Sequence, residues 1–350
     1  MNLTSDIIQF QLPDQLACPK PTEQRNIARD DVRLLVTTGS GNVEHSYFRN
    51  FTEYLQAGDV LVVNTSATQA AAFPIALPNN RKGMIHFSTQ ISDLEWLVEI
   101  REVIGNKNIR WKKGEENMVF QLPANTSIKL KRKFYRDREL LHLWVVELES
   151  NKDFQSYLSQ YGQAIKYMNL DESYPLDYYQ TFFSFHPGSS EMPSAGRGFT
   201  QALVNKLLKK GVVFAPILLH TGVSSLEENE TPYPEYFEVD PMSAAIINNA
   251  KENARKVVAV GTTAVRAVES ATNKAGKVMP YKGNTSLYIT SDYQMKSVSS
   301  LLTGFHEPKA SHLQMLQSLA GPEHIERAYS TAINNDYYWH QFGDLHLILR

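Results

Sequence analysis

The segment 257–269 combines residue types that could bind an anion. A run of four apolar residues, 257–260, leads into a short turn and then directly into a helical pattern. The residues of the turn are Gly261, Thr262 and Thr263. Such a turn leaves backbone N–H groups free at the positive end of a helix, where a carboxylate or phosphate can bind. Arg266, one helical turn later, could reach the same anion with its planar guanidinium. The alternative is an ordinary connection with a threonine N-cap and an Arg266–Glu269 pair on the surface.

Two histidines lie where proton transfer could take place. His220 ends an apolar stretch and is followed closely by Gly222. Ligands of open α/β sheets bind at the carboxyl ends of strands, and a neutral histidine there could orient a hydroxyl or exchange a proton. His306 lies in a loop with His312 nearby, but no cysteine or carboxylate pattern completes a zinc site, so we predict no metal. For His220, which ends a strand, a purely structural role is the alternative.

Two further segments are candidates for ligand contact. In Ser194-Ala195-Gly196-Arg197-Gly198, two glycines would let the backbone approach a ligand and Arg197 would supply charge, unless this is a plain flexible loop. A basic cluster occupies 129–138, with aromatic residues inside it. It could follow an RNA backbone and stack on bases. Alternatively, it is the solvated face of a strand, since Ile128 and Leu130 alternate with lysines.

The elements that would position these residues divide the chain into two patterns. Short β-like runs separated by Gly, Pro and Asn extend from about 60 to 149, which indicates a compact β-barrel or sandwich. After residue 150, strands alternate with helices, which indicates a parallel sheet. We therefore predict a mixed α/β fold with an α/β domain, 1–60 and 150–350, and an inserted small β-barrel domain, 61–149.

Composition narrows the possible functions. Of the 350 residues, 42% are hydrophobic and 21% are charged, as in folded proteins. The 35 basic and 37 acidic side chains leave a formal charge of -2, so any RNA contact must come from a local patch. A single cysteine, Cys18, excludes an intramolecular disulfide. Neither a signal peptide nor a membrane-spanning apolar run is visible, so we expect a cytoplasmic protein, and a monomer is favoured.

The order of motifs resembles the S-adenosylmethionine:tRNA ribosyltransferase-isomerases of queuosine biosynthesis. The resemblance runs nearly end to end. Its most specific blocks are Val260-Gly261-Thr262-Thr263-x-Val265-Arg266 and Phe305-His306-x-Pro308. Other matching blocks are Ala57-Gly58-Asp59-Val60-Leu61-Val62-Val63-Asn64, Ser194-Ala195-Gly196, Leu219-His220-x-Gly222, Glu235-Tyr236 and Phe342-Gly343-Asp344.

The resemblance implies an α/β domain with an inserted β-barrel and an unusual reaction. The ribosyl part of S-adenosylmethionine, which is a substrate rather than a cofactor, would move to the aminomethyl group of a 7-deazaguanine in tRNA. It would rearrange to an epoxycyclopentanediol while adenine and methionine leave. His220 and His306 would be the acid–base candidates. The substrate would be bound by Asn64, Ser194, Ala195, Gly196, Gly222, Gly261, Thr262, Thr263 and Arg266.

Several family positions are altered here, and two alternatives stay open. Ser66-Ala67 and Ala70-Ala71-Ala72 stand where the family carries arginines, and the segment 81–86 lacks the family's glutamate. One alternative is an S-adenosylmethionine-binding paralogue with a different acceptor, such as a small molecule. The other is a non-catalytic binding protein that keeps the turn at Gly261 as a ligand site.

Overall fold

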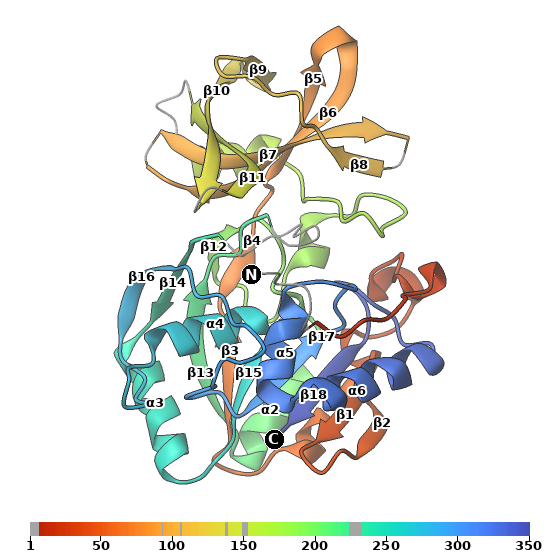
Figure 1. Ribbon diagram of the computed structural model, residues 1–350, viewed down its shortest axis with the longest axis vertical. Coiled ribbons are helices and arrows are strands. Elements are labelled where there is room, and N and C mark those ends of the chain that lie inside the picture. The colour runs from red at the N-terminus through yellow and green to blue at the C-terminus, as the bar shows by residue number, and fades with distance from the viewer. Residues whose placement is uncertain (1–6, 93, 106, 137–138, 149–152, 224–232) are drawn as a thin grey trace.

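Two large β-sheets, one above the other in Figure 1, organise the computed structural model. The structure describes residues 7–92, 94–105, 107–136, 139–148, 153–223 and 233–350. One sheet has nine strands and mixed direction, and the other has seven and is antiparallel. This confirms the predicted mixed α/β fold with a small β-barrel.

The nine-stranded sheet has the order β16-β14-β13-β3-β15-β17-β18-β1-β2. Its strands are β1 (Arg33–Thr38), β2 (Val43–Tyr47), β3 (Val60–Asn64), β13 (Val213–Leu219), β14 (Glu235–Val239), β15 (Val257–Val260), β16 (Tyr281–Thr285), β17 (Ser300–Gly304) and β18 (Leu345–Leu349). The four neighbours β13, β3, β15 and β17 are parallel to one another. Their carboxyl ends therefore meet at one edge of the sheet.

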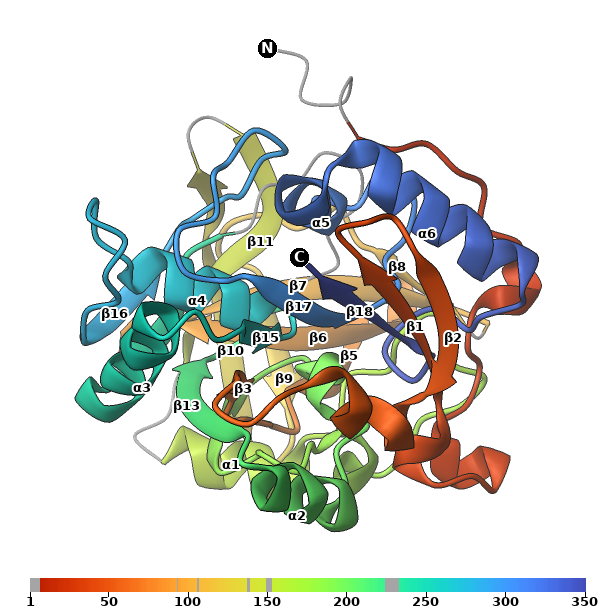
Figure 2. The same ribbon diagram turned by 90° about the horizontal axis from the view of Figure 1, so that it is seen from below.

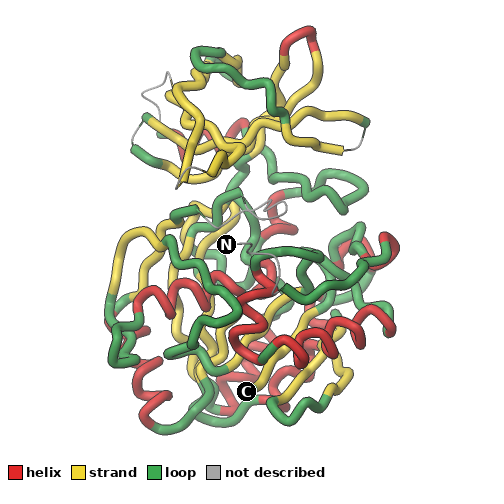
Figure 3. The backbone as a smooth tube through the Cα atoms, viewed as in Figure 1, coloured by secondary structure: helices red, strands yellow, loops and turns green. Residues whose placement is uncertain are grey.

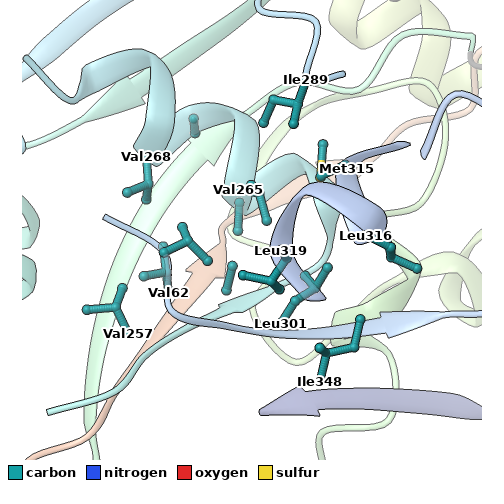
Figure 4. Close-up of a cluster of buried hydrophobic side chains, with 14 of the residues drawn as sticks. Val62, Val257, Val265, Val268, Ile289, Leu301, Met315, Leu316, Leu319 and Ile348 are labelled. Carbon is teal, nitrogen blue, oxygen red and sulfur yellow. The ribbon is translucent and has the colours of Figure 1, made fainter. Parts of the chain in front are cut away.

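Helices cover both faces of this sheet. The side chains of each strand alternate between the faces, so both faces carry apolar side chains that must be covered. Val60 and Val62 of β3 pack toward one cluster, and Leu61 and Val63 pack toward another. The first cluster lies under α3 (Pro241–Glu252), α4 (Thr262–Ala271), α5 (His312–Ala320) and α6 (Pro322–Asn334), and Figure 4 shows its centre. The second lies under α2 (Gln201–Lys210), on the side opposite α6 in Figure 2.

The seven-stranded sheet is nearly closed, since β5 and β9 at its two ends lie close together. Its strands are β5 (Ala72–Leu77), β6 (Arg81–Gln90), β7 (Glu95–Ile104), β8 (Lys107–Arg110), β9 (Val119–Leu122), β10 (Thr126–Arg136) and β11 (Glu139–Leu148). Figure 3 shows that strands dominate this part of the molecule. Its interior is aromatic and aliphatic, and α1 (Phe154–Tyr161) adds Tyr157 and Leu158 to that core.

Two short strands lie between the sheets in Figure 1. β4 (Ser66–Thr68) continues the chain from β3 and pairs in parallel with β12 (His186–Ser189). The run beginning at Val60, grouped above with the barrel strands, pairs instead with β13 and β15 in the nine-stranded sheet. The division into domains at 61 and 149 stays a prediction.

Local signals in the sequence set several element boundaries. Thr200 caps α2 by accepting a hydrogen bond from the Leu203 N–H, and Gly211 ends that helix in the left-handed conformation. Asp240 caps α3 ahead of Pro241. The turn at 39–42 joins β1 and β2 into a hairpin, since these two strands pair antiparallel. No helix in the described ranges is long and apolar enough to cross a membrane.

Glu269 of α4 holds the segment that leads into β17. Its buried carboxylate accepts hydrogen bonds from the backbone N–H groups of Lys296, Ser297 and Val298, at 3.0, 2.9 and 2.9 Å. The Tyr293 hydroxyl donates a fourth, at 3.1 Å. The alternative considered above, a surface pair between Arg266 and Glu269, is therefore wrong, because Glu269 is buried and occupied by backbone donors.

The replacement Glu269→Ala should lower the free energy of unfolding by about 3 kcal/mol, because buried N–H groups lose their acceptor. Urea unfolding followed by circular dichroism measures this change. The exposed Glu252→Ala at the end of α3 is the matched control and should change stability little. Equal stability of the two variants would contradict this role of Glu269.

Candidate functional site

The candidate site lies at the edge where β13, β3, β15 and β17 end. Asn64 ends β3, His220 follows β13, and Gly261 follows β15. β3 runs toward the seven-stranded sheet, so this edge faces it (Figure 1). The register aligns Asn64 with Ile217 and Val260 with Leu302, which places these strand ends at similar heights. Parallel strands thus bring together residues that are far apart in sequence.

The side chain of Asn64 connects neighbouring strands at this edge by hydrogen bonds. Its Oδ1 accepts hydrogen bonds from the N–H groups of Leu219 and Ser66, at 3.0 and 3.1 Å. Its Nδ2 donates to the Leu219 carbonyl at 2.8 Å and lies 3.5 Å from Oγ1 of Thr263. The side chain, predicted to bind substrate, is thus engaged in joining β3, β13 and the α4 turn.

The turn before α4 exposes unused backbone donors. Gly261 has φ +89°, a conformation that favours glycine, and no side chain caps the helix, so the threonine N-cap considered above is wrong. Within the described chain, the N–H groups of Thr262 and Thr263 donate to no carbonyl or side chain. They lie at the positive end of a ten-residue helix. The turn can therefore receive a carboxylate or phosphate.

The Ser194–Gly196 turn packs against this position. A Cβ built on Gly261 would lie 3.4 Å from the Cβ of Ala195, so the two predicted segments are neighbours. Arg197, in contrast, is buried and occupied by the protein. It forms an ion pair with Glu23 and donates to Thr22 Oγ1 and to the Tyr178 carbonyl, both at 2.9 Å. It therefore supplies no free charge to a ligand.

Arg266 is buried rather than exposed to solvent. Its guanidinium forms an ion pair with Glu235 and donates to the Leu287 carbonyl at 3.1 Å. The other carboxylate oxygen of Glu235 accepts from the Gly222 N–H at 2.9 Å. Only glycine fits at 222, because a Cβ there would lie 1.8 Å from the Tyr233 hydroxyl. Nη2 of Arg266 is buried without a partner in the described chain, so one donor stays unused.

His220 is held by a hydrogen bond at one nitrogen and is partly exposed. Its Nδ1 lies 2.8 Å from Oγ of Ser66, and its ring stacks on Tyr236 with centroids 5.7 Å apart. Burial, with a smaller contribution from His186, lowers the pKa of His220 to about 4. The imidazole is therefore neutral at pH 7.

His306 occupies a separate position on the same edge. Its Nε2 lies 2.9 Å from Oγ1 of Thr303, and its ring stacks on His312 at 4.7 Å. Burial and the neighbouring His312 lower the pKa of His306 to about 3. β13 and β17 are three strand spacings apart, roughly 14 Å. The two predicted acid–base histidines therefore do not form a contacting pair.

A buried charged cluster on the seven-stranded sheet was missed by sequence reasoning. Glu99 accepts from Arg101 at 2.7 and 2.9 Å and from Arg110 at 3.0 Å, and His86 Nδ1 lies 3.7 Å away. Burial raises the pKa of Glu99, but the contacts with His86 and Arg101 outweigh it and lower the pKa to about 2. Nε2 of His86 is buried without a partner in the described chain. Strand alternation places Glu99 and Arg101 on one face, but no spacing signal links them to the site.

The basic cluster at 129–138 behaves largely as a charged strand surface. Lys131 pairs with Glu147 at 2.7 Å and Arg132 with Glu95 at 3.1 Å. Residue 138 and the side chains at 135 and 136 lie outside the described residues. In the rest of the described chain, no group of three or more His, Cys, Asp or Glu residues could hold a metal ion.

Comparison with known proteins identifies the family. A sequence model of the family described as "Queuosine biosynthesis protein" matches residues 5–348. The S-adenosylmethionine:tRNA ribosyltransferase-isomerase of Desulforamulus reducens is 32% identical over 353 residues, covering 97% of this chain and 98% of the relative. That of Carboxydothermus hydrogenoformans is 31% identical over 349 residues, with the same coverage. The chain belongs to the S-adenosylmethionine:tRNA ribosyltransferase-isomerase family.

A solved structure agrees with this assignment. The crystal structure of the S-adenosylmethionine tRNA ribosyltransferase from Thermotoga maritima is 25% identical and has a TM-score of 0.54. It covers 97% of this chain, and this chain covers 99% of it. Family membership and the family's enzyme class thus confirm the predictions made from the motifs. The roles of the individual site residues stay predictions.

The imidazole of His220 should titrate near pH 4, so its NMR signals should stay constant between about pH 6 and 8. In urea-unfolded protein the same side chain should titrate near 6.5. Because the unfolded chain binds the proton more readily, this group should reduce stability as pH falls from about 6.5 toward 4. Comparison with spectra of His220→Asn assigns the signal. A folded-state midpoint at or above pH 6 would disprove the prediction.

Proposed function

We propose that this chain transfers the ribosyl part of S-adenosylmethionine to 7-aminomethyl-7-deazaguanine in tRNA and isomerises it to an epoxycyclopentanediol. Adenine and methionine are the other products. The observation that carries the proposal is the unused donor pair at the start of α4, on the same sheet edge as the neutral His220. Relatives that match nearly the full chain carry the name of this activity. The reaction takes place in the cytoplasm, where the tRNA is.

The α4 turn is suited to the methionine carboxylate of the donor. Two N–H groups and the helix dipole favour a single negative charge there. The buried Arg266 guanidinium lies one turn along the same helix, and its charge is already balanced by Glu235. A small, singly charged group fits this arrangement better than a dianionic phosphate.

The two histidines act at different parts of the substrate, because three strand spacings separate them. Both have lowered pKa values, about 4 for His220 and about 3 for His306, and both are neutral in the free protein. Each can therefore hydrogen-bond to the substrate without first losing a proton. Thr303 orients His306, as Ser66 orients His220.

An alternative acceptor has one specific observation in its favour. The formal charge is -2, and Lys131 and Arg132 of the basic cluster are paired with glutamates. A family member that uses a small-molecule acceptor needs no extended phosphate-binding surface. Product release in the presence and absence of tRNA separates the two acceptors.

Purified protein incubated with S-adenosylmethionine should release adenine and methionine only when tRNA carrying the aminomethyl-deazaguanine is present. Mass spectrometry measures both products. The same tRNA without that base is the control for the acceptor. Release with neither tRNA present would establish a different acceptor, and no release from folded protein would overturn the proposed reaction.

Removal of the donor's carboxylate should weaken its binding about 10- to 100-fold, because the charge-assisted hydrogen bonds at Thr262 and Thr263 are lost. The inhibition constant of decarboxylated S-adenosylmethionine, measured by competition, is compared with the dissociation constant of S-adenosylmethionine itself. Equal values of the two constants would show that the carboxylate binds elsewhere.

A further inference from the structure

A chain of hydrogen bonds runs from a peptide N–H group to His220. The Thr221 N–H donates to Oγ of Ser189 at 3.0 Å. Ser189 Oγ lies 2.6 Å from Ser66 Oγ, which lies 2.8 Å from Nδ1 of His220. Both serines are fully buried, so water does not reach their hydroxyls. The direction of the chain therefore follows from the protein alone.

The first member of the chain has a fixed role, because a peptide N–H can only donate. Ser189 accepts that bond and is then able to donate its own proton to Ser66. Ser66 in turn donates to Nδ1 of His220. In this direction each hydroxyl accepts once and donates once, so every buried group is satisfied.

The opposite direction leaves a buried donor unpaired. If Nδ1 of His220 donated to Ser66, Ser66 would donate to Ser189, which already accepts from Thr221. The Ser189 hydroxyl would then need another acceptor, and its contacts in the described chain are limited to Thr221 N and Ser66 Oγ. An unmet buried hydroxyl costs about 1–3 kcal/mol. The first direction is therefore favoured.

We propose that Ser66 and Ser189 are positioning residues that hold His220 as the neutral tautomer with its proton on Nε2. Nε2 then donates a hydrogen bond to a ring nitrogen of the purine that leaves the ribosyl donor. The inference rests on the proposed function for the identity of that acceptor. The tautomer itself follows from the hydrogen bonds and is measurable without substrate.

The position of His220 suits the purine end of the donor. β13 and β15 are two strand spacings apart, so His220 lies roughly 10 Å from the α4 turn that we assign to the carboxylate. Tyr236 stacks against the imidazole and presents an aromatic ring at the same place. An extended donor can therefore span the edge from α4 to His220.

The protonation state of the His220 imidazole is the same before and after the chemical step. The bond between purine and sugar breaks and its electron pair goes to the purine ring, while a lone pair of the sugar ring oxygen stabilises the electron-deficient sugar carbon. The Nε2–H hydrogen bond stabilises the charge that develops on the purine, and its proton stays on His220. The departing purine takes its final proton from water. This assigns His220 as a hydrogen-bond donor rather than the acid–base residue expected above.

Nitrogen-15 NMR of the free protein tests the tautomer. We expect the shift of a lone-pair nitrogen at Nδ1 and of a protonated nitrogen at Nε2, with His220→Asn used for assignment. Ser66→Ala should mix the two tautomers. Ser190→Ala is the matched control, because its buried hydroxyl donates to the Ser88 carbonyl at 3.0 Å, outside the chain. A proton on Nδ1 of the unaltered protein would overturn the proposal.

Kinetics test the donor role. His220→Gln keeps an N–H donor but cannot take up a proton as an imidazole can, so it should retain clearly more activity than His220→Ala. Ser66→Ala should lower kcat about 10-fold with little change in KM, whereas Ser190→Ala should not. Equal loss in the Gln and Ala variants would show that His220 transfers a proton. If the unaltered protein releases no adenine at all, the proposed function fails while the NMR result still decides the tautomer.

Discussion

The hydrogen bonding of β3 to a parallel strand on each side is the constraint on which the other features depend. β13 and β15 both pair with it in register, and both faces of β3 are covered by side chains from helices. Parallel strands buried in this way are extended by crossovers, so each new strand ends at the same edge. The fold thus places Asn64, His220 and Gly261 at one edge, although these residues are far apart in the sequence.

Polar groups at this edge are satisfied by one another, which limits what they can offer a ligand. Glu235 joins the Gly222 N–H to the Arg266 guanidinium, and Asn64 is used by backbone groups of β3 and β13. Burial of such charges is tolerable only because they are paired. Among the described residues of this edge, the polar groups left without a partner include two N–H groups at α4, Nη2 of Arg266 and one nitrogen of the His220 imidazole. A site of this kind selects its ligand by geometry more than by total charge.

Prediction from a sequence is most direct where one residue type has one local effect. Thr200, Gly211 and Asp240 mark helix ends through their own conformational preferences, and they do so in the structure. It is less direct for side chains whose partners are distant in sequence. Arg266 pairs with Glu235 and Arg197 with Glu23, and no periodicity connects these positions. Ser66 stood out only as an altered family position, and Ser189 carried no signal, because the role of a serine depends on neighbours that the sequence does not show.

The placement of Ser66 has a mechanical consequence. It lies on β4, the short strand through which the chain passes from the nine-stranded sheet into the seven-stranded one. Hydrogen bonds weaken steeply over a few tenths of an ångström. A macromolecule that bound the seven-stranded sheet and tilted it would therefore pull on the Ser66–His220 contact. Docking at a distant surface would then change which nitrogen of the His220 imidazole carries the proton.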